Sequence, residues 1–468
     1  MRRAVAAAAL VLAACLPRVH LAPLREALGA EGEVWVYLQP LPEDAARLAL
    51  SFEEVALARG DGTLLPLELA LRDLPAGGVA RQRLLASGRA PPGSYPALVV
   101  RIRRATLSGE AGPVDLLVPE EPVRVDLDLE LGRGRARVVQ LALRPGQALD
   151  QDFSFGAAFS TSARPPAAMV AQLAGYCPSA GSASVAVFDR RAKQVVSVFA
   201  TGREPRAVAV DGRAARGYVA LAGEDQIQVV DLATGEELRR IPLRPGDEPR
   251  DLALTPDGRL LVAANRGSNS AAVLETEPGL VLDRVPAGDA PWSLLLDRAG
   301  RRAYVLNRRS NDVTVVDVGN RAAVGTIATD PEPIGAALNR AETRLYVVHR
   351  GSAWMNAYSL PDLAPAGRFF VGLGAGAVKV DPRTGRILVG RDDAGRIDVY
   401  DPVSLLPVDG FDVPGPVAYL AIDEMENALV VVMPALRSVA LVDLTSRRVL
   451  SSVDVGDDPG RAVVIGER

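Results

Sequence analysis

Short apolar segments recur along the C-terminal two thirds of the chain. From about residue 182 the pattern returns about every 42 residues, and each copy holds four strand-length segments separated by turns, most clearly between Asp289 and Asp330. Four short strands in a unit of this length are typical of one blade of a β-propeller. A ring of such blades buries the faces of its sheets, which an open array would leave exposed at its ends.

Two markers count the copies. The first is a proline that opens the first strand of a copy, at Pro205, Pro249, Pro291, Pro333, Pro416 and Pro459. Ala375 takes the place of this proline in the remaining copy, which makes seven copies. The second marker is an acidic residue that closes the third strand, at Asp189, Asp231, Glu275, Asp317, Asp401 and Asp443, with Ser359 in the remaining copy. Both markers indicate seven blades.

The two ends of the repeat region predict how the ring closes. Residues 457–465 supply one strand, whereas residues 168–202 supply three strands without a first one. The C-terminal strand is therefore expected to complete the N-terminal blade, because this pairing leaves no inner edge unpaired. The prediction is a seven-bladed β-propeller over residues 168–468, with a closing blade shared by both ends of the repeat region.

A preceding stretch, residues 31–155, alternates apolar and polar positions in strand-length pieces. The pieces lie at 34–38, 47–58, 64–71, 97–104, 114–118, 123–131 and 136–143. About six to eight antiparallel strands predict a β-sandwich domain, so the fold class is all-β throughout. Residues 156–167 hold few apolar side chains and are predicted to be the linker to the propeller. The alternating acids of residues 123–131 are interpreted as a solvated strand face rather than a calcium site.

The start of the chain has the pattern of an export signal. A basic end, Met1–Arg3, precedes an apolar run, Ala4–Ala14, which is shorter than the roughly 20 residues that a membrane-spanning helix needs. Leu12–Cys15 resembles the bacterial lipobox, and this resemblance implies that Cys15 is acylated and becomes the new N-terminus. Residues 1–15 would then be the signal peptide and lipobox. The alternative is a plain secretory signal in which Cys15 is incidental.

Lipidation at Cys15 would place the protein in the bacterial cell envelope. Leu16 follows the cysteine where inner-membrane retention signals have aspartate, so the resemblance implies the outer membrane. Residues 16–30 are predicted to form the tether. The second cysteine, Cys177, is interpreted as a small buried hydrophobe, and an acylated Cys15 could not form a disulfide with it.

Two stretches carry resemblances to known families. Residues 303–307 and 310–317, AYVLN and SNDVTVVD, resemble the Tyr-Val-Thr-Asn (YVTN) propeller repeat of bacterial and archaeal surface proteins, and looser copies stand at 260–265 and 345–349. The resemblance implies the propeller fold, but its members include surface-layer, binding and redox-associated proteins, so it does not assign a function. Residues 90–95, APPGSY, resemble the proline-glycine-tyrosine turn of transthyretin-like bacterial sandwich domains.

Four arginines stand in equivalent turns between the second and third strands of successive blades. They are Arg266, Arg308, Arg350 and Arg391. These turns open on the same face of a propeller as the turns between blades, so the arginines could form an arc that binds a carboxylate or another small anion. The alternative is that acids of the turns between blades neutralise them. Those acids are Glu204, Asp247, Glu248, Asp289, Glu332, Asp457 and Asp458.

Other polar and aromatic residues lie close to that face. Asn265, Asn307 and His349 precede the arginines and are predicted to be structural, with side-chain oxygens bonded to the turn backbone. Trp292 and Trp354 could stack on a ligand, although packing at the core or rim is the commoner use of tryptophan.

Few residues suit catalysis or a bound cofactor. His20 and His349 are the two histidines, too few for a multi-histidine metal site, and the sequence contains no Cys-x-x-Cys-His haem motif. We therefore predict no metal and no cofactor. A calcium-dependent hydrolase, similar to some propeller lactonases, would need acids from several blades at the axis. The inward positions are predicted to be small and apolar instead, as at residues 207–209 and 375–377.

These observations favour a membrane-anchored extracytoplasmic lipoprotein that binds or scaffolds through the propeller face without catalysis. The expected partners are the membrane, through the lipid anchor, and another envelope protein, a polysaccharide or a small anion. A formal net charge of -4 gives no general attraction for nucleic acid, so none is expected to bind. The alternative function is a calcium-dependent, lactonase-like hydrolase or a redox-accessory propeller.

Overall fold

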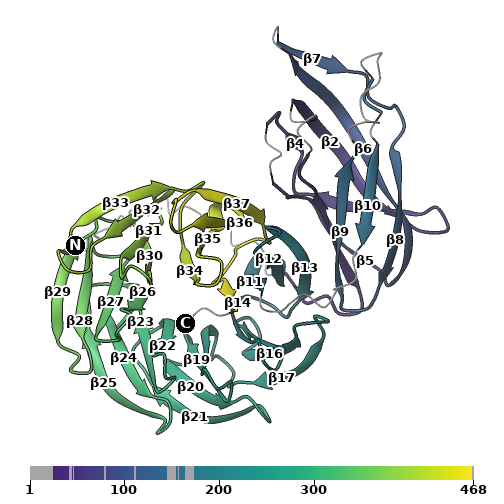
Figure 1. The fold of residues 1–468 in the computed structure, drawn as a ribbon. Helices are drawn as coiled ribbons and strands as arrows, with labels where there is room; N and C mark the ends of the chain where they lie inside the picture. Colours follow the sequence, from purple (N-terminus) through teal and green to yellow (C-terminus); the bar gives the residue numbers. More distant parts are fainter. Residues whose placement is uncertain are drawn as a thin grey trace, which may run out of the picture.

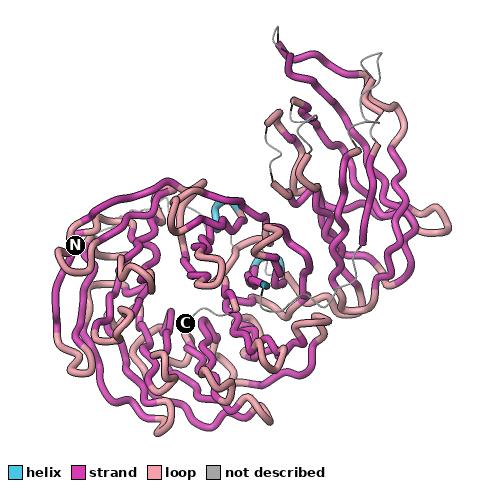
Figure 2. The backbone as a smooth tube through the Cα atoms, in the orientation of Figure 1, coloured by secondary structure: helices cyan, strands magenta, loops and turns pink. Residues whose placement is uncertain are grey.

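The protein consists almost entirely of β-strands, arranged as a curled N-terminal sheet and a seven-bladed propeller (Figures 1 and 2). The computed structural model describes residues 25–41, 45, 47–77, 81–109, 112–144, 154–156, 158–163 and 173–465. Cys15 and the predicted signal and tether up to residue 24 lie outside these residues. Within the described ranges, no helix is long and apolar enough to cross a membrane.

The N-terminal domain is a ten-stranded sheet that curls around its own core. Its strands are β1 (Gly32–Leu38), β2 (Leu48–Ala58), β3 (Leu64–Leu69), β4 (Asp73–Leu74), β5 (Arg83–Ala90), β6 (Gly93–Gly109), β7 (Gly112–Leu116), β8 (Val123–Leu131), β9 (Ala136–Leu143) and β10 (Phe159–Ala163). The order is β10-β9-β1-β5-β3-β2-β6-β7, with β4 paired to β2 and β8 to β6. Only two residue pairs join β3 to β5, so the sheet folds into two halves like a sandwich.

Three features of this domain differ from the sequence prediction. The segment predicted as a linker contains β10, which pairs with β9 and covers the core through Phe159. β5 was not predicted, because its sequence RLLASGRA has no regular alternation of apolar and polar residues. β1 and β9 run parallel, whereas an antiparallel sheet was expected. In each case contacts with strands distant in sequence determine the structure, because the local pattern of apolar and polar residues is weak.

The turn between β5 and β6 contains the tyrosine noted in the sequence. Tyr95 is fully buried, and its hydroxyl donates a hydrogen bond of 2.5 Å to the carbonyl oxygen of Pro91. Gly93, between them, has a φ of +149°, a conformation that residues with a side chain rarely adopt. The phenolic ring therefore fills the core while its polar end fixes the turn.

The propeller has seven four-stranded sheets. Blades 2 to 4 consist of β14 (Pro205–Asp211), β15 (Arg216–Leu221), β16 (Gln226–Asp231) and β17 (Glu237–Pro242); β18 (Pro249–Leu254), β19 (Leu260–Asn265), β20 (Ser270–Glu275) and β21 (Leu280–Pro286); and β22 (Pro291–Leu296), β23 (Arg302–Asn307), β24 (Asp312–Asp317) and β25 (Ala322–Ala328). Blades 5 to 7 consist of β26 (Pro333–Leu338), β27 (Arg344–His349), β28 (Trp354–Ser359) and β29 (Pro365–Phe370); β30 (Ala375–Val380), β31 (Ile387–Arg391), β32 (Arg396–Tyr400) and β33 (Pro407–Asp412); and β34 (Tyr419–Asp423), β35 (Ala428–Met433), β36 (Ser438–Asp443) and β37 (Val449–Asp454).

Blade 1 closes the ring as predicted. It consists of β11 (Ala174–Ser179), β12 (Ser184–Asp189), β13 (Gln194–Ala200) and the C-terminal β38 (Val463–Val464). β38 pairs antiparallel with β11 through Gly175–Val464 and Tyr176–Val463. The copy without a proline also forms a blade, because Ala375 begins β30 as expected. Short 3₁₀ turns occur at Ala180–Ser182 and Pro434–Leu436.

The N-terminal domain packs on the outer side of the ring where blades 1 and 7 meet (Figure 1). Trp35 and Tyr37 point out of their own domain and join one apolar cluster with residues of both blades. Asp454 of β37 accepts hydrogen bonds from Arg81 and Arg83, each 2.9 Å long, and from the backbone N–H of residue 84. The joint between the two ends of the ring is therefore covered from outside.

Candidate functional site at the mouth of the propeller channel

The innermost strands of blades 2 to 5 carry one partly exposed position directly after the opening proline. In blades 2, 3 and 4 this position is Arg206, Arg250 and Trp292. The residue before the proline has a left-handed φ of +51°, +47° and +53° in these blades. Because the turn is repeated and proline holds φ near −65°, the following side chain points the same way in each blade, toward the channel.

These side chains line a cavity of about 180 Å³ at the mouth of the channel. Arg206, Arg250, Lys379 and Arg461 bring four positive charges to it, with Asp458 as an acid in its wall. Much of the remaining wall is small, and it comes from Gly335, Ala336, Gly376, Ala377 and Ala418. The cavity is therefore lined by cations, and small residues leave the space in front of them open.

Burial perturbs the electrostatics of one of these cations, Arg250. Burial, reinforced by the nearby Arg206 guanidinium, lowers the pKa of Arg250 to about 9. Its guanidinium carbon lies 4.0 Å from the ring centroid of Trp292. Among the described residues, no carboxylate or carbonyl lies within hydrogen-bond or ion-pair distance of this guanidinium. Arg250 therefore carries its charge at neutral pH without a protein anion bonded to it.

Two aromatic rings hold the cations in place. Trp292 lies against Arg250 and also against Arg308, whose guanidinium carbon is 4.8 Å from the ring centroid. Tyr419 lies against Arg461 at 4.5 Å and against the Lys379 ammonium at 5.6 Å. Each ring thus attracts two cations through its negative face, which fixes the positions of long side chains that would otherwise be mobile.

Arg461 links three blades across the channel. It lies beside the C-terminal strand of blade 1, and its Nη1 atom donates to Ser293 Oγ at 3.2 Å and to the carbonyl oxygen of Leu294 at 3.3 Å, both in blade 4. The same group forms an ion pair with the buried Asp251 of blade 3. Asp251 also accepts a 2.7 Å hydrogen bond from the Leu294 backbone N–H. This network holds the C-terminal segment against blades 3 and 4.

The four arginines predicted to form an arc lie around the mouth, and none of them lines the cavity. Arg266 pairs with Glu248 at 2.7 Å and Arg308 pairs with Glu332 at 2.9 Å, so the predicted neutralisation by acids of the turns between blades is confirmed for both. Arg391 pairs with Asp393 and donates to backbone carbonyls. Arg350 is exposed.

The two tryptophans occupy different places. Trp292 lines the cavity, whereas Trp354 lies at the start of β28, the third strand of blade 5. Its ring contacts Phe370 edge to face, with the centroids 5.4 Å apart, and Arg368 lies over it at 4.9 Å. Trp354 therefore belongs to an aromatic pair at the outer rim.

The polar residues that precede the arginines, among them Asn265 and Asn307, have a structural role. Their side-chain hydrogen bonds differ from the predicted ones. The amide nitrogen of Asn307 donates to Asp312 Oδ1 at 2.6 Å and to Thr314 Oγ1 at 2.8 Å, and that of Asn265 donates to Ser270 Oγ at 3.3 Å. The side-chain oxygens of both asparagines are buried without a hydrogen-bond partner among the described residues. The expectation that these oxygens bind the turn backbone was wrong, because the third strand offers side-chain acceptors to the amide nitrogens.

The prediction that inward positions are small and apolar also needs correction. Ala207 and Ala209 pack in the core between blades, and Arg206 before them is the residue that faces the channel. Gly376 and Ala377 do line the cavity. The pattern that could have found the cations is the position after the opening proline, which holds Arg206 and Arg250 in consecutive blades.

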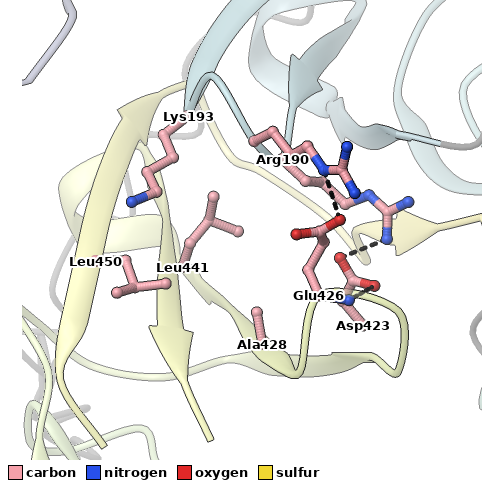
Figure 3. A pocket seen from close by; sticks show the side chains of 8 residues that line it. Arg190, Lys193, Asp423, Glu426, Ala428, Leu441 and Leu450 are labelled. Carbon is pink, nitrogen blue, oxygen red and sulfur yellow. Dashed lines mark hydrogen bonds and ion pairs between the residues drawn. The ribbon is translucent and has the colours of Figure 1, made fainter. Parts of the chain in front are cut away.

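A second cavity, of about 260 Å³, lies between blades 1 and 7 on the opposite face (Figure 3). Four of its five charged residues are paired with one another: Arg190 with the equally buried Asp423, and Arg191 with Glu426 at 2.8 Å, while Lys193 is the fifth. An anion or cation entering there would compete with existing ion pairs. This arrangement favours the channel mouth as the site, although its cavity is smaller. Among the described residues, no group of three or more His, Cys, Asp or Glu side chains could hold a metal.

Comparison with known proteins gives a limited match. The family model described as "Lactonase, 7-bladed beta-propeller" matches residues 202–281 and 247–334. The search of curated proteins gives no match. A solved structure of Kuenenia stuttgartiensis Hydrazine Synthase aligns over 59% of this chain and 90% of that chain, with 16% sequence identity and a TM-score of 0.48. Blades 2 to 4 of this propeller are thus similar in sequence to the seven-bladed lactonase family.

Proposed function

We propose that the protein is an extracytoplasmic lipoprotein, anchored through Cys15, that binds an anionic group at the mouth of its propeller channel without catalysis. The ligand carries a carboxylate or phosphate, either as a small molecule or as part of a larger envelope component. The observation that carries this proposal is Arg250, a buried guanidinium that lines the cavity and, among the described residues, has no acid within ion-pair distance.

The positive charge of the cavity supports the proposal that its ligand is an anion. Arg206 is already paired, with Asp458 at 2.6 Å and Glu204 at 3.1 Å, and Arg461 is paired with Asp251. Arg250 lies beside Arg206 without such a partner, and this proximity disfavours its charged form. An incoming anion would remove that penalty, because an opposite charge at close range stabilises the protonated guanidinium.

The chemistry of the guanidinium limits the kinds of anion that the cavity can bind. The planar guanidinium fork of Arg250 lies in the cavity wall, with its central carbon 4.0 Å from the ring centroid of Trp292. Such a fork matches two oxygens of a carboxylate or phosphate, and charge-assisted bonds of this kind are about twice as strong as neutral ones. The anchor on Cys15 is supported by the order of basic end, apolar run and cysteine in the first 15 residues.

Isothermal titration calorimetry of the full chain in detergent tests the proposal, with sodium phosphate and sodium acetate as probes. Arg250→Met should weaken binding at least tenfold, since it removes a charge-assisted bidentate contact, which contributes about 1.5 to 3 kcal/mol. Arg396→Met is the control, because Arg396 is nearly half exposed on β32 and pairs with Asp398 at 2.8 Å away from the cavity. No binding of either probe at millimolar concentration, or equal loss in both variants, would overturn it.

A hydrolase is the second candidate, and the lactonase-family match over blades 2 to 4 favours it. This function would use calcium at the axis, by analogy with lactonases that have this fold. A ligand that binds only the folded state raises the melting temperature, so calcium should stabilise the protein and a chelator should reverse the effect. A melting temperature that calcium leaves unchanged while phosphate or acetate raises it would support anion binding instead.

A further inference from the structure

We infer that the C-terminal segment, residues 457–465, both closes the ring and forms one wall of the anion site, so that anion binding and ring closure stabilise each other. This inference rests on the proposed function and adds a regulation of the same site. Residues of this segment contact blades 1, 2, 3, 4 and 7, and two of its side chains, Asp458 and Arg461, lie in the wall of the cavity.

Backbone pairing of the segment with blade 1 is short. β38 contributes two residue pairs with β11, and an isolated bridge joins Pro459 to Ser179. Further backbone bonds run from the Gly460 N–H to the Pro178 carbonyl at 2.7 Å and from the N–H groups of 180 and 181 to the carbonyls of 458 and 457. A second isolated bridge joins Arg461 to Ala207 of blade 2. Ala462 and Val464 are buried among blades 1 and 7. The innermost strands of the other blades pair over five or six residues, so the strand ladder at this joint is shorter.

The segment gains its other contacts inside the channel. Arg461 reaches Ser293 of blade 4 and forms an ion pair with Asp251 of blade 3. Asp458 accepts from Arg206 of blade 2 at 2.6 Å. The side chains that hold the C-terminal segment against blades 2, 3 and 4 are thus the same side chains that surround the space in front of Arg250.

An anion in this space contacts cations from both sides of the joint. Arg250 belongs to blade 3, whereas Arg461 belongs to the closing segment, and both lie in the cavity wall. A ligand that interacts with the two together binds the closed ring more tightly than an open one. By linkage the ligand must then favour closure by the same free energy by which closure favours the ligand.

Hydrogen exchange of the full chain in detergent, read by mass spectrometry on peptides covering 457–465, tests the inference with phosphate as the probe. At ten times its dissociation constant, phosphate should slow exchange of this segment about tenfold. Arg461→Met should speed exchange in the absence of phosphate and reduce the protection that phosphate gives. Arg396→Met, on the outer part of blade 6, should leave exchange of the segment unchanged both with and without phosphate.

The outcomes separate this inference from the proposed function. If phosphate binds, as judged by calorimetry, but leaves exchange of residues 457–465 unchanged, the coupling is wrong and anion binding stands. If phosphate and acetate both fail to bind, the proposed function fails and the coupling fails with it. In that case the ligand-free comparison still decides whether Arg461 holds the segment, because exchange in Arg461→Met equal to that in Arg396→Met would exclude this role.

Discussion

Arg250 shows how the position of one side chain on a repeated strand determines its chemistry. It follows an opening proline, as Arg206 and Trp292 do in the neighbouring blades, and the repeated turn directs all three toward the channel. Arg266 and Arg308 in the turns between second and third strands have acids beside them, whereas Arg250 has an aromatic ring. A guanidinium on a ring remains available to a ligand, and a guanidinium in an ion pair does not.

The affinity for acetate should depend on pH through Arg250. Its lowered pKa, about 9, means that the guanidinium is charged below that pH and becomes neutral above it. Acetate stays ionised throughout, so its affinity should be constant from neutral pH to about pH 8 and then fall by about tenfold per pH unit above 9. Calorimetry in a series of buffers measures this.

Arg206→Met provides the matched control. The positive charge of Arg206 is the second cause of the lowered pKa of Arg250, so its removal should move the fall in affinity to higher pH. An acetate affinity that does not change between pH 8 and pH 10 would show that Arg250 does not hold the ligand.

Strands with a strong periodic pattern were predictable, and those formed by distant pairing were not. All four strands of each complete blade follow the repeat, and the strand at the chain's end was found because three others lacked a partner. β5 and β10 carry few regularly spaced apolar residues, so they can be identified as strands only from their pairing with β1 and β9 in the structure. Part of the cavity was hidden for the same reason. The position after an opening proline locates Arg206 and Arg250, but the sequence gives no sign that Lys379 and Arg461 face the same channel.

β37 and the segment around Arg81 form one polar part of the contact between the domains. Asp454 accepts from both Arg81 and Arg83, and its side chain is 12% exposed. Asp454→Asn should destabilise the protein by about 1 to 2 kcal/mol, because it leaves two partly buried guanidinium groups without their carboxylate. Thermal unfolding followed by circular dichroism measures the loss.

Asp412→Asn is the control for this prediction. Asp412 also pairs with an arginine, Arg396, but its side chain is 84% exposed. Loss of such a surface pair should cost less than about 0.5 kcal/mol. Equal melting temperatures for the two variants would show that the Asp454 contacts do not hold the domains together.

At the scale of the whole molecule, the proposed location depends on the first 15 residues rather than on the fold. Cys15→Ser should abolish incorporation of labelled palmitate and move the protein from the membrane fraction to the soluble one, because a single acylated residue is the proposed anchor. Cys177→Ser is the control, since Cys177 is fully buried in the propeller and should have no effect on fractionation. Palmitate labelling that persists in Cys15→Ser would contradict the lipoprotein assignment.

Closure by the C-terminal strand also determines the order in which the protein can be completed. The ribosome delivers the chain from its N-terminus, so blades 2 to 7 can pair their strands as each one emerges. Blade 1 must wait for residues 463–464, although its other three strands appear first. The N-terminal domain also contacts β37, so its docking surface is finished late as well. A translation product that stops short of the last dozen residues would contain every domain and still lack a closed ring.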